Sequence, residues 1–488
     1  MLVLLPLLLL APIGAVACLA PALAPRAGRV ATLVTGALFA LALVLAGRVV
    51  ASGPVEGAHL WLRADGLSAL VTLVVTSVAF ACAAYGEYYM PVVLDRERAE
   101  DRWPAGRYEA LFLTLVSGMM LGALANNLGL LWIAIEAATL ASALLVGYYR
   151  RPGAVEAGWK YLLLCSVGIA LALLATVLLY YSAVHVLGDG SRGLHWSVLR
   201  EVAASLDPRF VKLAFLFALA GYGAKAGLAP MHSWLPDAYS QAPTPVAALM
   251  STALLATSLS ALLRFHAVTA ACVGQGWSNG LLILFGVLSM VMATPFLLVQ
   301  GEYKRLLAYS SIEHTGIITF AIGIGTPLAV FGGVLHLFVQ SYAKSLAFLV
   351  GGSIARGSGS RRMDQWSGAL EASPALGTLL VGAGLGLVGL PPAATFFSEW
   401  LALAGAFASP HRGAAITALV ALVIVFAGLT FHWGRMALGK ARPRFKDLLP
   451  TASHAPLWAL LAVLVLLGFW LPAPLRALLD RAVEVLRS

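Results

Sequence analysis

Long apolar runs separated by short polar loops make up this chain from one end to the other. Each run has about 20 residues, which is the length a helix needs to cross a bilayer. We count roughly fourteen such runs. The clearest expected helices are 28–50, 66–86, 109–126, 127–149, 159–181, 246–266, 278–299, 413–437 and 456–475. The pattern predicts an all-α polytopic membrane protein with little sequence left for a soluble domain.

The stretch 221–250 interrupts this pattern. Lys225 stands in an apolar helical run that Pro230 ends, and helix is expected to resume at about Val246. Proline removes a backbone donor and clashes with the preceding turn, so the helix must break here. Inside a bilayer such a break is tolerated only where it faces protein or water, and a charge beside it is typical of an ion path. The alternative is a proline-rich loop with a lysine that reaches to the membrane surface.

A second break follows the same scheme later in the chain. Gly389-Leu390-Pro391-Pro392 repeats the Gly-Leu before a proline that is seen at Gly227-Leu228-Ala229-Pro230, and Glu399 lies beyond the break. Two proline-interrupted spans at corresponding places in two halves indicate internal repeats and a binding path. The glycines just before the second break favour close helix packing and not a nucleotide loop, because no strand precedes them.

Two ionisable residues lie in the helices between 127 and 181. Glu136 is about 13 Å from the start of its helix at 1.5 Å per residue, and no basic residue stands three or four positions away. A carboxylate at that depth is a functional candidate, the alternative being a protonated Glu hydrogen-bonded inside the bundle. Lys160, near the start of the next helix, is either a path residue or a lysine that snorkels to the interface.

Polar residues also gather in two later helices. They are Ser310, Ser311, Glu313, His314 and Thr315 in the first helix, and His336, Gln340 and Lys344 in the second. One buried histidine is usually a hydrogen-bonded core residue, but a helical stripe that includes a lysine favours a hydrated path.

Composition supports the membrane class and excludes others. Hydrophobic residues make up 60% of the chain and charged residues 11%, against roughly a quarter charged in soluble proteins. Single cysteines without a CxxC pair argue against an iron–sulfur or zinc site. No nucleotide or flavin motif is present either. We therefore expect no metal, no cofactor and no redox centre in this chain.

The net charge of +10 indicates orientation and not nucleic-acid binding, because the basic residues lie in short loops between helices. Residues 1–20 lack the basic start of a signal peptide, so we expect a retained first helix that begins outside. The loops then predicted to lie inside contain Arg26, Arg29, Arg96, Arg98, Arg102, Arg107, Arg150, Arg151, Lys304, Arg305, Arg356, Arg361, Arg362, Lys440, Arg442, Arg444 and Lys446. The predicted outer loops contain only scattered arginines, so both termini are expected on the outer side of a bacterial cytoplasmic (inner) membrane.

The chain resembles the antiporter-like membrane subunits of respiratory complex I, Mrp antiporters and membrane-bound hydrogenases. The segments that carry the resemblance are LLWIAIEAATLASALLVGYY, EAGWKYLLLCSVGIALAL, KAGLAPMHSWLPDAYSQAPTPVAALMS, YKRLLAYSSIEHTGII and HLFVQSYAKSLAFLVGGSI. Within that family the chain looks most like the hydrogenase-4 component F type. The resemblance implies fourteen helices with two inverted five-helix repeats and two broken helices. It divides the chain into helices 1–3 (1–108), a first repeat (109–270), a second repeat (271–440) and a last helix (441–488).

The family's functional residues fall on charged positions already singled out. By resemblance, Glu136 is the glutamate of the fifth helix, Lys225 the lysine of the broken seventh, His336 and Lys344 the polar residues of the eleventh, and Glu399 the charge of the twelfth. Possible accessory groups are Lys160, His232, Asp237 and His314.

One position departs from the family's pattern. Complex I subunits of this type usually carry a lysine in the eighth helix, where this chain has Ala256. Water or the hydroxyls of Ser258 and Ser260 would have to bridge the gap.

The expected function is proton translocation by a membrane subunit of a hydrogenase-4-like or complex I-related oxidoreductase. Electron transfer would then belong to partners, namely other membrane subunits and a hydrogenase-like peripheral arm. The alternatives are a subunit of an Mrp-type cation/proton antiporter and a structural membrane anchor. Sodium-dependent transport would favour the first of these alternatives. Unchanged pumping after neutralisation of the charges would favour the second.

Overall fold

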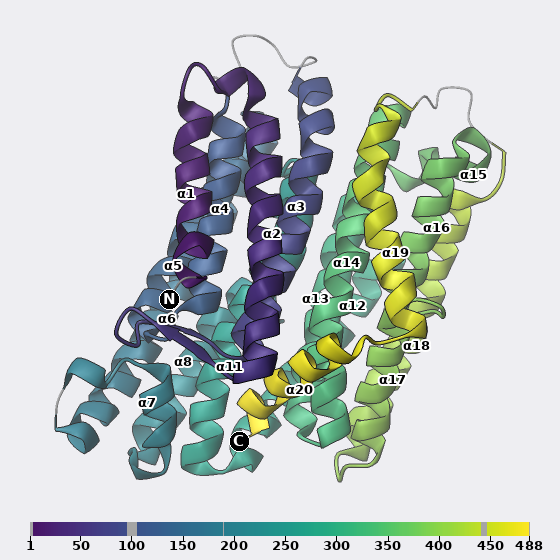
Figure 1. Ribbon diagram of the computed structural model, residues 1–488. Helices are drawn as coiled ribbons and strands as arrows, with labels where there is room; N and C mark the ends of the chain where they lie inside the picture. The colour runs from purple at the N-terminus through teal and green to yellow at the C-terminus, as the bar shows by residue number, and fades with distance from the viewer. Residues whose placement is uncertain (1–2, 95–104, 189, 441–446, 488) are drawn as a thin grey trace.

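A computed structural model describes residues 3–94, 105–188, 190–440 and 447–487, and the fold is built almost wholly from helices (Figure 1). The helices of the first half are α1 (Leu4–Leu19), α2 (Ala27–Ser52), α3 (Gly66–Leu94), α4 (Arg107–Leu124), α5 (Leu128–Val146), α6 (Pro152–Leu187), α7 (Trp196–Glu201), α8 (Pro208–Ala226), α9 (Leu235–Gln241), α10 (Thr244–Leu249) and α11 (Leu255–Val273). Those of the second half are α12 (Gln275–Val299), α13 (Tyr303–Ile324), α14 (Pro327–Ser358), α15 (Ala369–Ala372), α16 (Pro374–Val388), α17 (Ala394–Phe407), α18 (Arg412–Ala437), α19 (Ala455–Phe469) and α20 (Ala473–Arg487).

In the described part of the chain, ten helices are long and apolar enough to span a membrane, and three shorter apolar helices accompany them. The shorter ones are α1, α16 and α17, the last two being the halves of the second broken helix. The prediction of an all-α polytopic membrane protein is therefore confirmed. Several basic residues on which the orientation argument drew, Arg96, Arg98, Arg102, Arg442, Arg444 and Lys446, lie outside the described residues.

Residue chemistry explains where several helices begin and end. Asn127 caps α5, its Oδ1 accepting hydrogen bonds from the N–H groups of Gly129 and Leu130 at 2.9 and 3.1 Å. Asp207 caps α8 in the same way, accepting from the N–H of Arg209 at 2.8 Å. These side chains satisfy donors that the first helical turn leaves open.

A small hairpin and a buried ion pair close one end of the first half. Strands β1 (Val55–Gly57) and β2 (Leu62–Ala64) pair antiparallel. Just after β2, Asp65 accepts hydrogen bonds from Arg264 of α11 at 2.9 and 3.3 Å. Both side chains are only 3% exposed, and the guanidinium also donates to Ser68 Oγ at 2.7 Å and lies 4.5 Å from the Trp196 ring. This ion pair joins the start of α3 to the middle of α11.

The C-terminal region differs from its prediction. The expected helix 456–475 ends at Phe469, and a separate helix, α20, follows. Trp470 is extended and Pro472 follows it, so the first helix cannot continue. The 15 residues of α20 put Leu478, Leu479 and several other apolar side chains on one face and charges on the other, which favours a helix lying on a surface.

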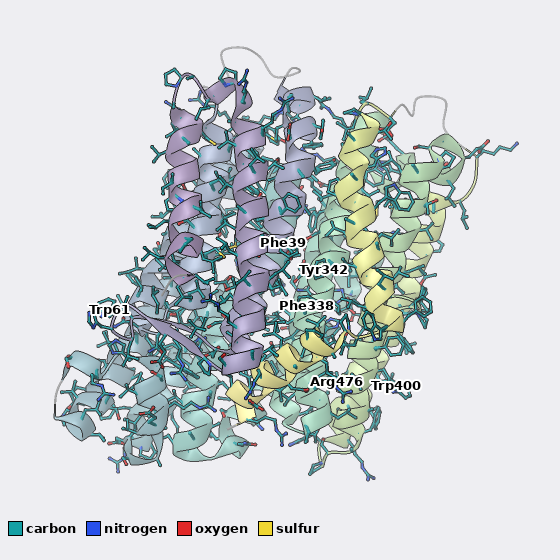
Figure 2. The ribbon with its side chains drawn as sticks, viewed as in Figure 1. Phe39, Trp61, Phe338, Tyr342, Trp400 and Arg476 are labelled. Atoms are coloured by element: carbon teal, nitrogen blue, oxygen red, sulfur yellow. The ribbon has the colours of Figure 1, made fainter. Side chains whose placement is uncertain are left out.

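Helix α20 runs crosswise in the lower half of the view in Figure 1 and touches both halves of the chain. It contacts α2, α3 and α11 on one side and α14 on the other, as its crosswise position in Figure 1 shows. Above it an apolar cavity of about 460 Å³ is lined by residues of α2, α3, α14, α19 and α20. Figure 2 shows Phe39, Phe338 and Tyr342 gathered there.

Candidate functional site

Both predicted helix breaks are present and share one local geometry. Helix α8 ends at Ala226 and α16 at Val388, and each is followed by a glycine in the left-handed conformation, Gly227 (φ +79°) and Gly389 (φ +65°). The leucine after each glycine donates its N–H back to the last helical turn, at 2.8 and 3.0 Å. Glycine tolerates this conformation best, so the Gly-Leu pairs end the helices inside the apolar region.

Lys225 occupies the last turn of α8 and is 2% exposed. Its Nζ donates a hydrogen bond to the Tyr161 hydroxyl of α6 and lies 4.4 Å from the centre of that ring. The Tyr161 hydroxyl is 2.7 Å from Ser142 Oγ on α5, and Ser142 already donates to the carbonyl of Ala138. Tyr161 therefore donates to Ser142, and the buried ammonium is tied through two hydroxyls to α5.

Glu136 lies on the same helix as Ser142 and is half-buried. Its Oε1 accepts from Ser166 Oγ at 3.3 Å, while its Oε2 is buried without a hydrogen-bond partner in the described structure. The charges of Glu136 and Lys225 interact electrostatically, although the hydrogen bonds of these two described residues go to Ser166 and Tyr161 and not to each other. The structure brings the two predicted residues into one region, with Tyr161 and Ser142 completing the cluster.

The second predicted cluster centres on two stacked histidines from neighbouring helices. His314 Nδ1 of α13 is 2.8 Å from His336 Nε2 of α14, and His336 Nδ1 is 2.8 Å from Ser398 Oγ of α17. Ser398 donates to the Thr395 carbonyl, so it accepts from His336 Nδ1–H. If both rings are neutral, His336 Nε2 then accepts a hydrogen bond from His314 Nδ1–H. This leaves His314 Nε2 as an acceptor that is buried without a partner among the described residues. Three helices are thus linked by one directional chain of hydrogen bonds.

Lys344 is fully buried on α14, eight residues after His336. Its Nζ donates to the Leu307 carbonyl at 3.1 Å, to Ser311 Oγ at 3.2 Å, and to Ser310 Oγ. The charge of Glu313, which is 3% exposed, interacts with that of Lys344. Gln340 bonds Ser341 of its own helix at 3.3 Å. The predicted stripe is therefore two groups, a histidine chain and a lysine held by hydroxyls.

Glu399 stands on α17 beyond the second break, and its carboxylate approaches the backbone closely at Gly389. A Cβ at that glycine would require the Glu399 carboxylate to shift, and the left-handed φ of +65° already disfavours other residues there. A ligand atom from each of His314, His336 and Glu399 lies within 4.8 Å of the others. Two imidazoles and a carboxylate could bind a divalent cation, a possibility that sequence analysis did not foresee. They could equally exchange protons.

The two clusters meet at the first break. Thr315, next to His314, donates from Oγ1 to the carbonyl of Ala226, next to Lys225, at 3.2 Å.

Ala256, where complex I subunits of this type usually carry a lysine, is fully buried in the apolar core on α11. The hydroxyls of Ser258 and Ser260, proposed as a bridge, donate to carbonyls of their own helix at 2.8 Å each. A π-helical segment, Met250–Leu254, joins α10 to this helix, a distortion often found at functional sites.

The remaining accessory candidates are set apart from both clusters. Lys160 Nζ lies 2.6 Å from Glu156 and 3.6 Å from Asp237, which also pairs with Arg305. The Lys160 side chain is 50% exposed, which fits an interfacial ion cluster better than a buried relay. His232 lies in the break, half-buried, with a buried Nδ1 that has no partner in the part of the chain that the structure describes.

Several residues of the clusters were not predicted as site residues, among them Tyr161, Ser142, Ser398 and Glu313. Glu313 carried a signal, because it is an acidic residue within an apolar run. Tyr161 and Ser142 carried none, since hydroxyls are common in membrane helices and only the fold places them beside Lys225.

The family model described as "NADH:quinone oxidoreductase/Mrp antiporter, TM" matches residues 125–426. The hydrogenase-4 component F homolog of Methylacidiphilum infernorum is 39% identical over 80% of this chain and 82% of its own length. NADH-quinone oxidoreductase subunit N of Desulforudis audaxviator is 30% identical over 75% of this chain and 69% of its own.

Solved structures share the fold along nearly the whole chain. A chain of respiratory complex I from Thermus thermophilus with bound aureothin is 27% identical with a TM-score of 0.75, covering 96% of both chains. A chain of the archaeal membrane-bound sulfane sulfur reductase has a TM-score of 0.87 at 23% identity, covering 100% of this chain and 98% of its own. The matches confirm the resemblance drawn from the sequence. The chain belongs to the NADH:quinone oxidoreductase/Mrp antiporter transmembrane family, as an antiporter-like membrane subunit.

Proposed function

We propose that this chain is a proton-translocating subunit of a hydrogenase-4-like or complex I-related oxidoreductase complex. The observation that supports it most strongly is Lys225, an amine buried at a helix break and held by a tyrosine hydroxyl. Buried ionisable groups inside a membrane bundle are costly and mark ion paths. The 39% identity to a hydrogenase-4 component F homolog supports the type of complex.

The proposed mechanism is electrostatic. An ammonium away from water is costly, and a nearby carboxylate offsets that cost. When the negative charge of Glu136 acts on Lys225, the lysine holds its proton. When a conformational change weakens that interaction, Lys225 releases it. The break at Gly227 gives the flexibility and the backbone polarity for such a change.

In the second half, protons would pass between Lys344 and the histidine chain and leave or be taken up at Glu399. His314, His336 and Ser398 already form a continuous chain of donors and acceptors. Glu399 and Glu313 line a common cavity of about 170 Å³ between α13, α16, α17 and α18. Redox chemistry would belong to partner subunits, including a hydrogenase-like peripheral arm. This chain itself would need no cofactor and no nucleic-acid partner.

We expect His336→Gln to reduce proton translocation about tenfold or more, because glutamine can hydrogen-bond but cannot take up and release a proton. The measurement is substrate-driven proton uptake by the assembled complex in vesicles, read with a pH-sensitive dye. His185→Gln, at an exposed end of α6, is the matched control and should keep normal uptake. Normal uptake by His336→Gln would remove the histidine chain from the path.

The same vesicles separate proton pumping from cation exchange. A relative from Rhizobium meliloti, named as part of a probable K⁺/H⁺ antiporter, is 30% identical over 71% of this chain and 33% of its own length, so exchange is the second candidate. Proton uptake that stops when Na⁺ and K⁺ are replaced by choline would favour exchange. Unchanged uptake favours pumping.

We also propose fourteen membrane crossings, arranged as two inverted five-helix repeats, with both termini on the outer side. A reporter active only in the cytoplasm should be silent after Ser488 and active in the loop near Arg361. The bias of basic loop residues gives this orientation. A reporter active only outside should give the opposite results. Cytoplasmic activity at the C-terminus would mean an odd number of crossings.

A further inference from the structure

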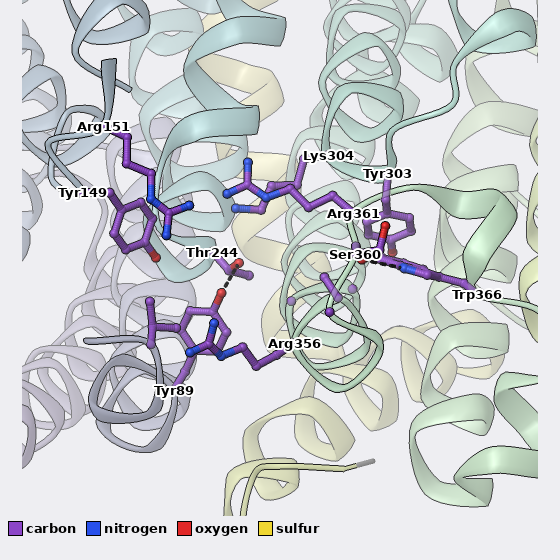
Figure 3. Close-up of a pocket in the computed structure, with 15 residues that line it drawn as sticks. Tyr89, Tyr149, Arg151, Thr244, Tyr303, Lys304, Arg356, Ser360, Arg361 and Trp366 are labelled. Atoms are coloured by element: carbon purple, nitrogen blue, oxygen red, sulfur yellow. Dashed lines mark hydrogen bonds between the residues drawn. The ribbon is translucent and has the colours of Figure 1, made fainter. Parts of the chain in front are cut away.

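A positively charged cavity of about 210 Å³ lies at the end of the molecule that the basic loops assign to the cytoplasm (Figure 3). Its cationic residues are Arg151, Lys304, Arg356 and Arg361, and tyrosines line it beside them. Among the described residues that line the cavity, none is acidic. Figure 3 shows the Lys304 and Arg361 head groups lying beside each other, with Arg151 across from them.

Two of these cations contact neutral groups. Lys304, which is 8% exposed, donates from Nζ to the Ala242 carbonyl at 2.8 Å. Arg361 donates from Nη1 to the Ser240 carbonyl at 3.0 Å. Glu302, two residues before Lys304, accepts from Ser240 Oγ at 2.5 Å and does not line the cavity, although its charge acts on Lys304. Two like charges are thus held together by backbone oxygens, an arrangement that an anion would stabilise.

The cavity also offers hydroxyl donors suited to an oxyanion. Tyr89 and Thr244 hydrogen-bond each other at 3.1 Å on its wall, and Ser360 lies on the opposite side (Figure 3). Arginine and lysine with hydroxyl groups are the usual partners of phosphate oxygens. The volume is smaller than the roughly 300–1,000 Å³ of pockets that enclose larger ligands. A single phosphate group fits it better than a nucleotide.

We propose that this cavity binds a phosphate group, carried by an anionic phospholipid headgroup or by free phosphate. The site would act on the first break as well, because Arg361 holds the carbonyl of Ser240 in the last turn of α9 and Lys304 holds that of Ala242 just after it. A bound phosphate would share those donors. Binding of the anion and the position of this end of α9 would then be coupled.

The test uses the full-length chain purified in a neutral detergent and stripped of lipid. Phosphatidylglycerol and phosphatidylcholine are added in one arm, and inorganic phosphate and chloride at equal ionic strength in the other. Binding is read as the rise in melting temperature with ligand concentration. We expect Arg361→Gln to weaken binding about tenfold or more, because a charge-assisted hydrogen bond to phosphate is lost.

The neighbouring Arg362→Gln is the matched control, since Arg362 pairs with Asp364 at 3.0 Å outside the cavity and should bind as the wild type does. Arg361→Lys should restore part of the affinity. Arg151→Gln, at an exposed position, tests the same site if Arg361→Gln fails to fold. A response to phosphatidylglycerol alone identifies a lipid headgroup, and a response to inorganic phosphate identifies a free anion. The proposal would be overturned if neither phosphatidylglycerol nor inorganic phosphate raised the melting temperature. It would also be overturned if Arg361→Gln and Arg151→Gln responded as the wild type does.

Discussion

Replacing Lys225 with methionine should abolish most proton translocation while leaving the complex assembled. Methionine keeps the length and the apolar packing of the side chain but cannot carry a proton. Without the ammonium, the Tyr161 hydroxyl still donates a hydrogen bond to Ser142, so the substitution leaves no buried hydroxyl without a partner among the described residues of this cluster. We expect a loss of about tenfold to a hundredfold or more in substrate-driven proton uptake, in line with the removal of a proton-transferring group. Uptake in vesicles and assembly on native gels are measured together.

The matched control lies on the same helix. Lys212→Met removes a lysine near the start of α8, where its ammonium lies 5.7 Å from the Trp277 ring, and should leave uptake unchanged. Glu136→Gln should reduce uptake in the same direction as Lys225→Met. If the two residues act as one unit, the double variant should be little worse than the worse single variant. An assembled Lys225→Met complex with wild-type uptake would disprove the mechanism.

A structural anchor would give the reverse ranking. In that case a charge left buried without its counterpart should destabilise the protein, by about 3–5 kcal/mol. The double neutral variant would then assemble better than either single variant. Native gels distinguish the two outcomes without any transport measurement.

Arg264→Met should destabilise the protein by about 3–5 kcal/mol, because it leaves the buried Asp65 carboxylate without its partner. Burial alone would raise the pKa of Asp65, but the charge and hydrogen bonds of Arg264 and the Ser68 N–H hold that pKa below its ordinary value. A carboxyl with a lowered pKa stabilises the fold above its ordinary pKa, and this contribution is lost as the pH falls through the lowered value. The measurements are melting temperature and yield of assembled complex.

The double variant Asp65→Asn/Arg264→Met should recover much of the loss, since no uncompensated charge remains buried. Arg209→Met, at the exposed start of α8, is the control and should melt as the wild type does. Equal melting temperatures for Arg264→Met and wild type would show that the ion pair contributes no stability.

Proline and glycine chemistry made the two helix breaks predictable from the sequence. Gly227 and Gly389 end their helices where the Gly-Leu-x-Pro pattern placed the breaks, because that chemistry is local. The same holds for Lys225 and Lys344 as buried charges, which the apolar runs around them indicated.

The partners of these residues could not be read from the sequence. Tyr161 is 64 positions from Lys225, and Asp65 is 199 positions from Arg264. No periodicity links such positions, since the contact is made only when separate helices pack. Helix α20 was missed for a different reason. The apolar run that forms α19 continues almost to the start of α20. Hydrophobicity alone therefore does not show where α19 ends and where α20 begins in a new direction.

The crosswise position of α20 bears on how the protein is made. Its contacts are with α2, α3, α11 and α14, all of which leave the ribosome earlier. The membrane helices can therefore insert one after another, while the lower edge between the two halves stays open until residues 473–487 have been synthesised. Chains generally fold from the N-terminus during synthesis. Covering this edge is thus the last step of synthesis, after the halves have already met through α3 and α14, α9 and α13, and α10 and α14.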